Sequence, residues 1–125
     1  MSKSYKILVI DDQEIIFKMI QKSLQSVGFN DIDYASSGKA GIELDEKNNY
    51  DLITCDITMP GMNGIETATE ILKRNPAKKM IMVTALGQED YVRQAMKIGI
   101  KNYLLKPFSP DKLVKTIATV FTTPV

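Results

Sequence analysis

The chain has 125 residues, of which 44% are hydrophobic and 25% are charged, proportions that are ordinary for one globular domain. Sixteen basic residues oppose fifteen acidic ones, and this net charge of +1 argues against binding to nucleic acid or to a membrane surface through bulk charge. Histidine is absent, which excludes histidine-based nucleophile pairs and histidine zinc sites, and no apolar run approaches the 18 residues of a membrane span.

Strand-like and helix-like segments alternate five times along the chain. Short apolar runs predict strands at residues 5–10, 32–35, 51–55, 79–84 and 102–105. Residues 8–10 and 80–83 are continuously apolar, which is typical of strands that are buried on both faces. The single cysteine, Cys55, lies inside one of these runs, so we expect a small buried side chain, no intrachain disulfide and a cytoplasmic location.

The segments between the strands have apolar residues at helical spacing, and each has a boundary signal. In chain order these signals are Gly28 after the first helix, Ser37 before the second, Asn75-Pro76 after the third, Gly99 after the fourth and Ser109-Pro110 before the fifth. The pattern predicts one α/β domain over residues 1–125, with its core at about 5–121. We expect a doubly wound, flavodoxin-like (βα)5 fold whose five parallel strands have the order 2-1-3-4-5.

Three carboxylates stand where predicted strands end. Asp11 and Asp12 follow the first strand and Asp56 follows the third, and these strands are neighbours in the predicted sheet, at the point where such sheets bind ligands. Two like charges about 4 Å apart repel by roughly 4 kcal/mol at an effective dielectric near 20, so the cluster calls for a cation. Carboxylate oxygens suit Mg²⁺. The alternatives are that Asp11 and Asp12 only cap the first helix or lie in a solvated loop, or that Asp12 both caps the helix and binds metal.

Thr84 ends the fourth predicted strand and Lys106 ends the fifth, so both belong on the same sheet edge as the acids. A hydroxyl donor and a cation beside acids and a metal outline a site for phosphoryl transfer. The peptide bond between Lys106 and Pro107 is left open: a cis bond would aim Lys106 inward, but most such bonds are trans.

The set Asp11-Asp12, Asp56, Thr84 and Lys106-Pro107 resembles the receiver domain of bacterial two-component response regulators, over nearly the whole chain. The resemblance implies a signalling phosphoacceptor rather than an enzyme. It makes Asp56 the residue that receives phosphate from a histidine kinase. Lys106 would contact the phosphoryl group, and Thr84 would move to donate a hydrogen bond to it.

The resemblance also implies a set of Mg²⁺ ligands and a switch residue. Asp12 and Asp56 would bind the metal through their side chains, Thr58 through its main-chain carbonyl, and Asp11 through a water molecule. Tyr103 matches the aromatic switch position of the family, where the side chain changes rotamer as Thr84 moves. The alternative for Tyr103 is an ordinary half-buried strand aromatic.

Residues 56–60 and 85–88 are similar to stand-alone chemotaxis receivers of the CheY type. This similarity implies a monomer that binds the flagellar switch through residues 88–98, 101–105 and 111–121, with a phosphatase as a further partner. The alternative is a phosphorelay intermediate, because residues 11–13 are similar to sporulation receivers, or another stand-alone receiver. An aspartyl-phosphate hydrolase is disfavoured, since Thr58 stands where such enzymes have a second acid. No glycine pattern of a nucleotide-binding loop is present.

Overall fold

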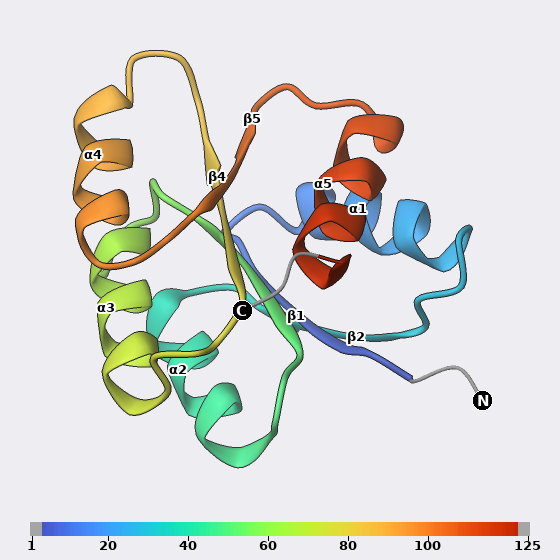
Figure 1. Ribbon diagram of the computed structural model, residues 1–125, viewed down its shortest axis with the longest axis horizontal. Helices are drawn as coiled ribbons and strands as arrows, with labels where there is room; N and C mark the ends of the chain where they lie inside the picture. The colour runs from blue at the N-terminus through green and yellow to red at the C-terminus, as the bar shows by residue number, and fades with distance from the viewer. Residues whose placement is uncertain (1–3, 123–125) are drawn as a thin grey trace.

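A computed structural model, which describes residues 4–122, contains five strands that alternate with five helices (Figure 1). The strands are β1 (Lys6–Ile10), β2 (Asp31–Ala35), β3 (Leu52–Asp56), β4 (Met80–Thr84) and β5 (Asn102–Leu105). The helices are α1 (Glu14–Gln25), α2 (Gly38–Lys47), α3 (Gly64–Arg74), α4 (Glu89–Lys97) and α5 (Pro110–Thr122). All strand pairs are parallel, and their order is β2-β1-β3-β4-β5, which confirms the predicted fold.

Two apolar cores lie on opposite faces of the sheet, because successive side chains of a strand point in opposite directions. In β1, Ile7 and Val9 pack in the core that contains α1 and α5. Leu8 and Ile10 pack in the core that contains α3 and α4. Figure 1 shows the same division, with α2, α3 and α4 on one side of the sheet and α1 and α5 on the other. Burial on both faces explains why the central strands are apolar at consecutive positions.

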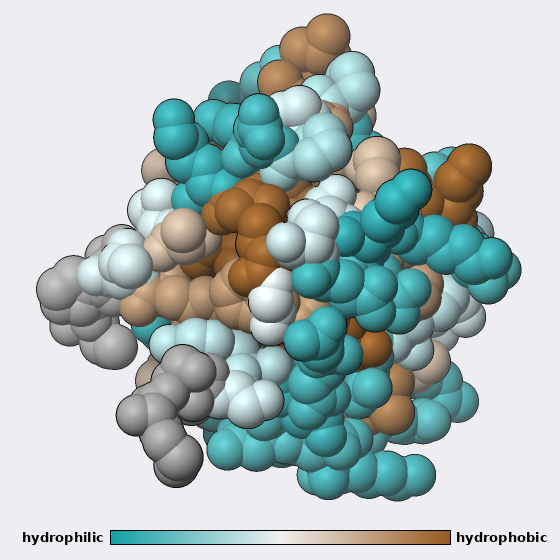
Figure 2. All heavy atoms as spheres, turned by 90° about the vertical axis from the view of Figure 1, so that its right-hand side faces the viewer, coloured by the Kyte–Doolittle hydropathy of each residue, from teal (hydrophilic) through white to brown (hydrophobic). Residues whose placement is uncertain are grey.

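The outer surface of the helices is mostly hydrophilic. Figure 2 shows the side of the molecule that contains α1 and α5, where polar side chains cover most of the face and smaller apolar areas lie between them. Ile15 and Val27 are among the exposed apolar side chains of the α1 region. Within residues 4–122, none of the helices has the length and apolar character needed to cross a membrane.

Two predicted serine caps are present. The Ser37 hydroxyl accepts a hydrogen bond from the main-chain amide of Ala40 at 3.1 Å, at the start of α2. The Ser109 hydroxyl accepts one from Lys112 at 3.1 Å, and α5 begins at Pro110. Each cap satisfies one of the amide groups that have no partner within the first turn of a helix. The starts of these helices are therefore encoded locally in the sequence.

Helix α1 ends earlier than predicted. Its last residue is Gln25, three residues before the glycine that was expected to terminate it. Gly28 has a φ of 97°, and the amide of Phe29 bonds to the carbonyl of Leu24 at 2.9 Å. The glycine therefore occupies a left-handed position in the turn that follows the helix, where a residue with a side chain would be strained.

An ion cluster around the buried Asp45 joins α2, α3 and the segment just before β4. The buried Asp45 carboxylate pairs with Arg74 and lies 3.4 Å from Lys78, whose side chain is also buried. The second acidic partner of Arg74 is the exposed Glu46, at 3.5 Å. Removing the carboxylate of Asp45 leaves the buried ammonium group of Lys78 without its counter-ion.

We therefore expect Asp45→Ala to lower the free energy of unfolding by about 3 kcal/mol. Glu46→Ala, which removes the exposed partner of the same arginine, is expected to change it by less than about 1 kcal/mol. Urea unfolding of the two variants beside the parent protein measures both values. Equal losses in the two variants would contradict a structural role for the ion cluster.

Candidate functional site

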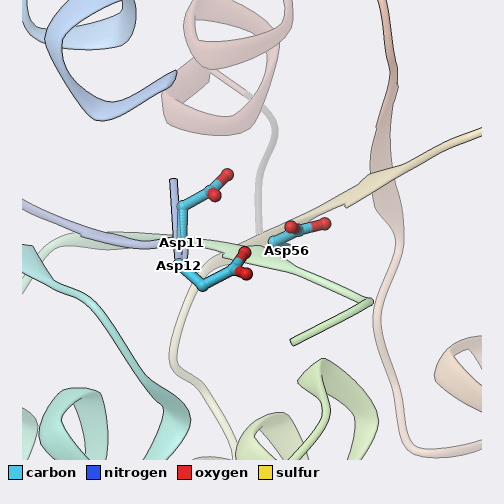
Figure 3. A group of neighbouring side chains, drawn as sticks. All are labelled: Asp11, Asp12 and Asp56. Carbon is cyan, nitrogen blue, oxygen red and sulfur yellow. The ribbon is translucent and has the colours of Figure 1, made fainter. Parts of the chain in front are cut away.

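Three carboxylates converge at the edge of the sheet where β1 and β3 end. Asp11 and Asp12 directly follow β1 and Asp56 is the last residue of β3. The two strands are hydrogen-bonded neighbours, with Ile10 opposite Cys55. One oxygen of each carboxylate lies within 4.8 Å of an oxygen of each of the other two. Figure 3 shows the three side chains beside one another at the ends of the two strands. The structure therefore brings together the acids that the strand pattern placed on one edge.

Two of the three acids are buried, and this burial dominates their electrostatics. Asp11 is 1% exposed and Asp56 is 6% exposed, whereas Asp12 is exposed to solvent. Burial raises the pKa of Asp56 above its ordinary value, Lys106 opposes that rise and Asp11 adds to it. Burial also raises the pKa of Asp11. Both shifts mean that the ionised carboxylates are less stable here than in water.

Lys106 is the cation of the site. Its ammonium nitrogen lies 3.2 Å from Oδ2 of Asp56 and 3.6 Å from Oδ2 of Asp11. The peptide bond between Lys106 and Pro107 is cis, which answers the question that the sequence left open. When all three acids are ionised, one lysine neutralises only part of their charge. The remaining negative charge suits a divalent cation.

A buried oxygen without a hydrogen bond also fits a metal. Among residues 4–122, Oδ2 of Asp11 is one of two buried side-chain oxygen atoms that have no hydrogen-bond partner, whereas its Oδ1 accepts a bond from the Gln13 amide at 2.9 Å. Buried acceptors are normally satisfied by a protein group or by ordered water. An ion with its own water shell would satisfy this oxygen, and the carboxylate-rich donor set is one that Mg²⁺ prefers.

The capping alternative for the two acids is wrong. Helix α1 begins at Glu14 with Gln13 at its N-cap, and no side chain caps it. Asp11 instead bonds to the amide two residues further on, as aspartate does in turns. Asp12 is exposed beside the cluster and is not part of the helix start.

Thr84 lies at the end of β4, as predicted, and its hydroxyl contacts the next loop. The hydroxyl donates to Oε1 of Gln88 at 3.2 Å and lies 3.4 Å from the carbonyl oxygen of Ala85. The main-chain carbonyl of Thr84 accepts a bond from the Lys106 amide at 2.6 Å. The residue is buried, so β4 and β5 hold their two site residues side by side.

Thr58 lies in the loop between β3 and α3 and is exposed. Its main-chain amide donates a hydrogen bond to the Asp56 carboxylate, and this bond offsets part of the rise in pKa that burial causes. Its hydroxyl accepts a hydrogen bond from the side-chain amide of Gln88. The expected metal contact of the Thr58 carbonyl stays a prediction.

Tyr103 is half-buried in β5. Its hydroxyl donates to the carbonyl of Ile100 at 2.7 Å, and burial raises its pKa above the ordinary value for tyrosine. Tyr103 therefore has the half-buried strand position that was the alternative prediction for it. The role as a switch residue stays a prediction, since it concerns a second conformation.

The loop after Asp56 is held by features that the sequence analysis missed. The Asn63 side chain accepts a bond from the Glu66 amide at 2.9 Å, and the Glu66 carboxylate accepts one from the Asn63 amide at 3.0 Å. This capping box starts α3. A Cβ atom on Gly64 would lie 2.2 Å from the carbonyl oxygen of Asp56, so only glycine permits this close approach. The asparagine followed three residues later by glutamate was the available signal.

Gln88 is the second residue that the sequence analysis did not assign. It contacts Thr58, Thr84 and Ala85 with one side-chain amide. Its neighbourhood was noted only for its similarity to chemotaxis receivers, because nothing in the sequence pairs a glutamine with a threonine thirty residues away. Its contacts depend on the tertiary arrangement of two loops.

Comparison with known proteins shows similarity to one family. A model of the response regulator receiver domain matches residues 7–118. A chemotaxis protein CheY from Treponema pallidum is 38% identical over 118 residues, which cover 93% of this chain and 82% of that protein. The structure of CheY4 from Vibrio cholerae is similar, with a TM-score of 0.88, 27% identity and coverage of 94% of this chain and 99% of that one. A CheX–CheY–BeF₃–Mg²⁺ complex from Borrelia burgdorferi gives a TM-score of 0.88 at 31% identity, covering 95% and 90% of the two chains.

Proposed function

Because the chain belongs to the response regulator receiver family, we propose that it is a phosphorylation-dependent switch whose phosphoacceptor is Asp56. A receiver domain is a signalling phosphoacceptor rather than a catalytic enzyme. The observation that carries the proposal is the position of Asp56. Its carboxylate lies within a cluster of three acids at the sheet edge and 3.2 Å from the ammonium group of Lys106.

The proposed donor is the phosphohistidine of a histidine kinase. One carboxylate oxygen of Asp56 attacks the phosphorus atom, so that a P–O bond forms while the P–N bond of the donor breaks. The electron pair of the P–N bond leaves with the imidazole of the donor. Lys106 supports this step because it places a positive charge beside the oxygens of the incoming group. The absence of histidine from this chain agrees with a donor supplied by another protein.

Mg²⁺ is the proposed cofactor. Asp12 and Asp56 would bind it through their carboxylates, Thr58 through its carbonyl, and Asp11 through a water molecule. When bound, the ion would neutralise charge on the acids and on the phosphoryl oxygens. The buried Oδ2 of Asp11, which has no hydrogen-bond partner, supports such a site, and the similar CheY complex named above contains Mg²⁺ and BeF₃.

The switch is proposed to run from Asp56 through Thr84 to Tyr103. A phosphoryl group adds about −1.5 to −2 charges at neutral pH and three strong acceptor oxygens. Thr84 would turn its hydroxyl toward these oxygens, and the Tyr103 ring would change rotamer in response. The two residues lie on neighbouring strands, β4 and β5, which supports their coupling. Phosphorylation then changes the face formed by α4, β5 and α5.

Chemotaxis is the output that we propose, with the flagellar switch as the target. Similarity to CheY proteins supports it. The proposed binding face also has large apolar side chains in solvent, at Tyr91, Met96 and Leu105. Exposed apolar groups on a protein surface favour contact with a protein partner. A phosphatase, a monomeric state and a cytoplasmic location belong to the same proposal.

The chemotaxis output is tested by binding. In Mg²⁺ and beryllofluoride, which mimics a phosphorylated aspartate, we expect affinity for a flagellar switch peptide to rise at least about tenfold. Fluorescence anisotropy of the labelled peptide measures this change, and Met96→Glu on α4 is expected to remove it. Transfer of phosphate from the protein to a histidine phosphotransfer protein, without peptide binding, would favour the phosphorelay alternative. Turnover of many phosphoester molecules per chain would favour a hydrolase.

A further inference from the structure

One side chain holds together the two loops that border the site. Oε1 of Gln88 accepts a hydrogen bond from the Ala85 amide at 2.8 Å and another from the Thr84 hydroxyl at 3.2 Å. Its Nε2 donates to the Thr58 hydroxyl. We call these three contacts the Gln88 bridge. They connect the loop that follows Asp56, the last residue of β3, to the loop that follows Thr84, the last residue of β4.

The orientation of the Gln88 amide follows from its partners. A main-chain amide only donates, so the oxygen of Gln88 must face Ala85, and its nitrogen must then face the Thr58 hydroxyl, which can accept. A main-chain bond of 3.2 Å from the Gln88 amide to the Ala85 carbonyl closes the same turn. Gln88 is half-buried, so water competes less with these contacts than it would on an open surface.

We propose that the Gln88 bridge opposes activation by engaging the Thr84 hydroxyl in the unphosphorylated protein. This inference rests on the proposed function, in which Thr84 donates to a phosphoryl group on Asp56. A hydroxyl has one proton and donates to one acceptor at a time. Thr84 must therefore leave Gln88, and the Ala85 carbonyl oxygen that lies 3.4 Å from the same hydroxyl, before it reaches the phosphoryl oxygens, which are charged and stronger acceptors. Gln88 is a positioning residue in this scheme, since it acts through Thr84.

The size of the effect follows from the interactions that are lost. A contact present only in the unphosphorylated state shifts the equilibrium toward that state by its own net contribution. One ordinary hydrogen bond changes an equilibrium about two- to tenfold. We therefore expect Gln88→Ala to lower the concentration of beryllofluoride at half saturation about three- to tenfold. Thr58→Val, which removes one contact of the bridge, is expected to lower it about two- to threefold.

The test combines two measurements in the presence of Mg²⁺. Hydrogen exchange at the Ala85 amide, without any phosphoryl mimic, reports the bridge itself, and we expect it to be about three- to tenfold faster in Gln88→Ala. Titration with beryllofluoride, followed by NMR, reports the regulatory effect. Gln25→Ala is the matched control, because Gln25 is an exposed glutamine at the end of α1, outside the site and the proposed binding face, and should leave both readouts unchanged. Gln88→Asn keeps the amide but shortens the side chain by one methylene, and should behave like Gln88→Ala.

The possible outcomes separate this inference from the proposed function. Unchanged exchange at Ala85 in both Gln88 variants would show that the bridge does not hold the loop. Faster exchange with unchanged or weaker beryllofluoride binding would show that the bridge does not oppose activation. Failure of the parent protein itself to bind beryllofluoride in Mg²⁺ would instead contradict the proposed function. Tighter binding in both Gln88 variants but not in Gln25→Ala is the result that we expect.

Discussion

Asp56→Asn is expected to reduce phosphoryl incorporation from acetyl phosphate at least about a hundredfold, because a carboxamide lacks the anionic oxygen that attacks phosphorus. Intact-mass spectrometry over time, with Mg²⁺ present, measures the modified fraction. Asn retains the shape of Asp and leaves the two neighbouring acids in place. A loss of this size would therefore identify the nucleophile rather than a general change in the site.

The stability of Asp56→Asn provides an internal check. Burial raises the pKa of Asp56, so above the ordinary pKa of an aspartate the ionised form is less favourable in the folded protein than in the unfolded chain. Replacing it by a neutral amide should therefore maintain or increase the free energy of unfolding at neutral pH. Asp31→Asn, at the exposed start of β2, is the matched control and should leave incorporation unchanged. Incorporation at an unchanged rate in Asp56→Asn would mean that another residue accepts the phosphate.

Removal of Mg²⁺ is expected to have the second largest effect. Chelation with EDTA should slow phosphoryl incorporation at least about tenfold, because no divalent cation then neutralises the acids and the incoming phosphoryl oxygens. Addition of Mg²⁺ to the metal-free protein should also raise the free energy of unfolding, by about 2.7 kcal/mol at one hundred times the dissociation constant. NaCl at equal ionic strength separates ion binding from general screening of the acids. Equal stabilisation by the two salts would contradict a metal site.

Asp12→Asn tests the metal site without touching the proposed nucleophile. Asp12 is exposed, so the variant should fold with little change in stability in the absence of metal. It removes one proposed ligand, and we expect the stabilisation by Mg²⁺ to fall by at least about 1 kcal/mol. Asp31→Asn again serves as the control for loss of one exposed carboxylate. Full stabilisation by Mg²⁺ in Asp12→Asn would exclude Asp12 as a ligand.

The strand ends show how much of the site local sequence can predict. Alternation of apolar runs with helical spacing defines a parallel sheet covered on both faces, because consecutive apolar residues in a strand need cover on both sides. Strand C-termini in such a sheet share one edge. Asp11, Asp56 and Thr84 could therefore be placed together before any coordinates were known. The serine caps of α2 and α5 were predictable for a similar reason, since each depends on neighbouring residues.

Predictions from the sequence failed where a contact depends on a distant segment, or where one side chain can bond to more than one nearby amide. Asp11 accepts a bond from the Gln13 amide, so the alternative that it caps α1 is wrong. The prediction that α1 stops at Gly28 was wrong by three residues, since α1 ends at Gln25 and Gly28 lies in the turn that follows. The Asn63–Glu66 capping box was readable and was missed.

Periodicity and chain direction, which are local properties of the sequence, predict the α/β fold class and place the acids, the threonine and the lysine at strand C-termini. The strand order came from comparison with known doubly wound folds. The packing of distant segments brings Lys106 within 3.6 Å of both Asp11 and Asp56 and lets Gln88 bridge Thr58 and Thr84. Such contacts depend on the packing of loops far apart in the chain, where a shift of an ångström makes or breaks a hydrogen bond.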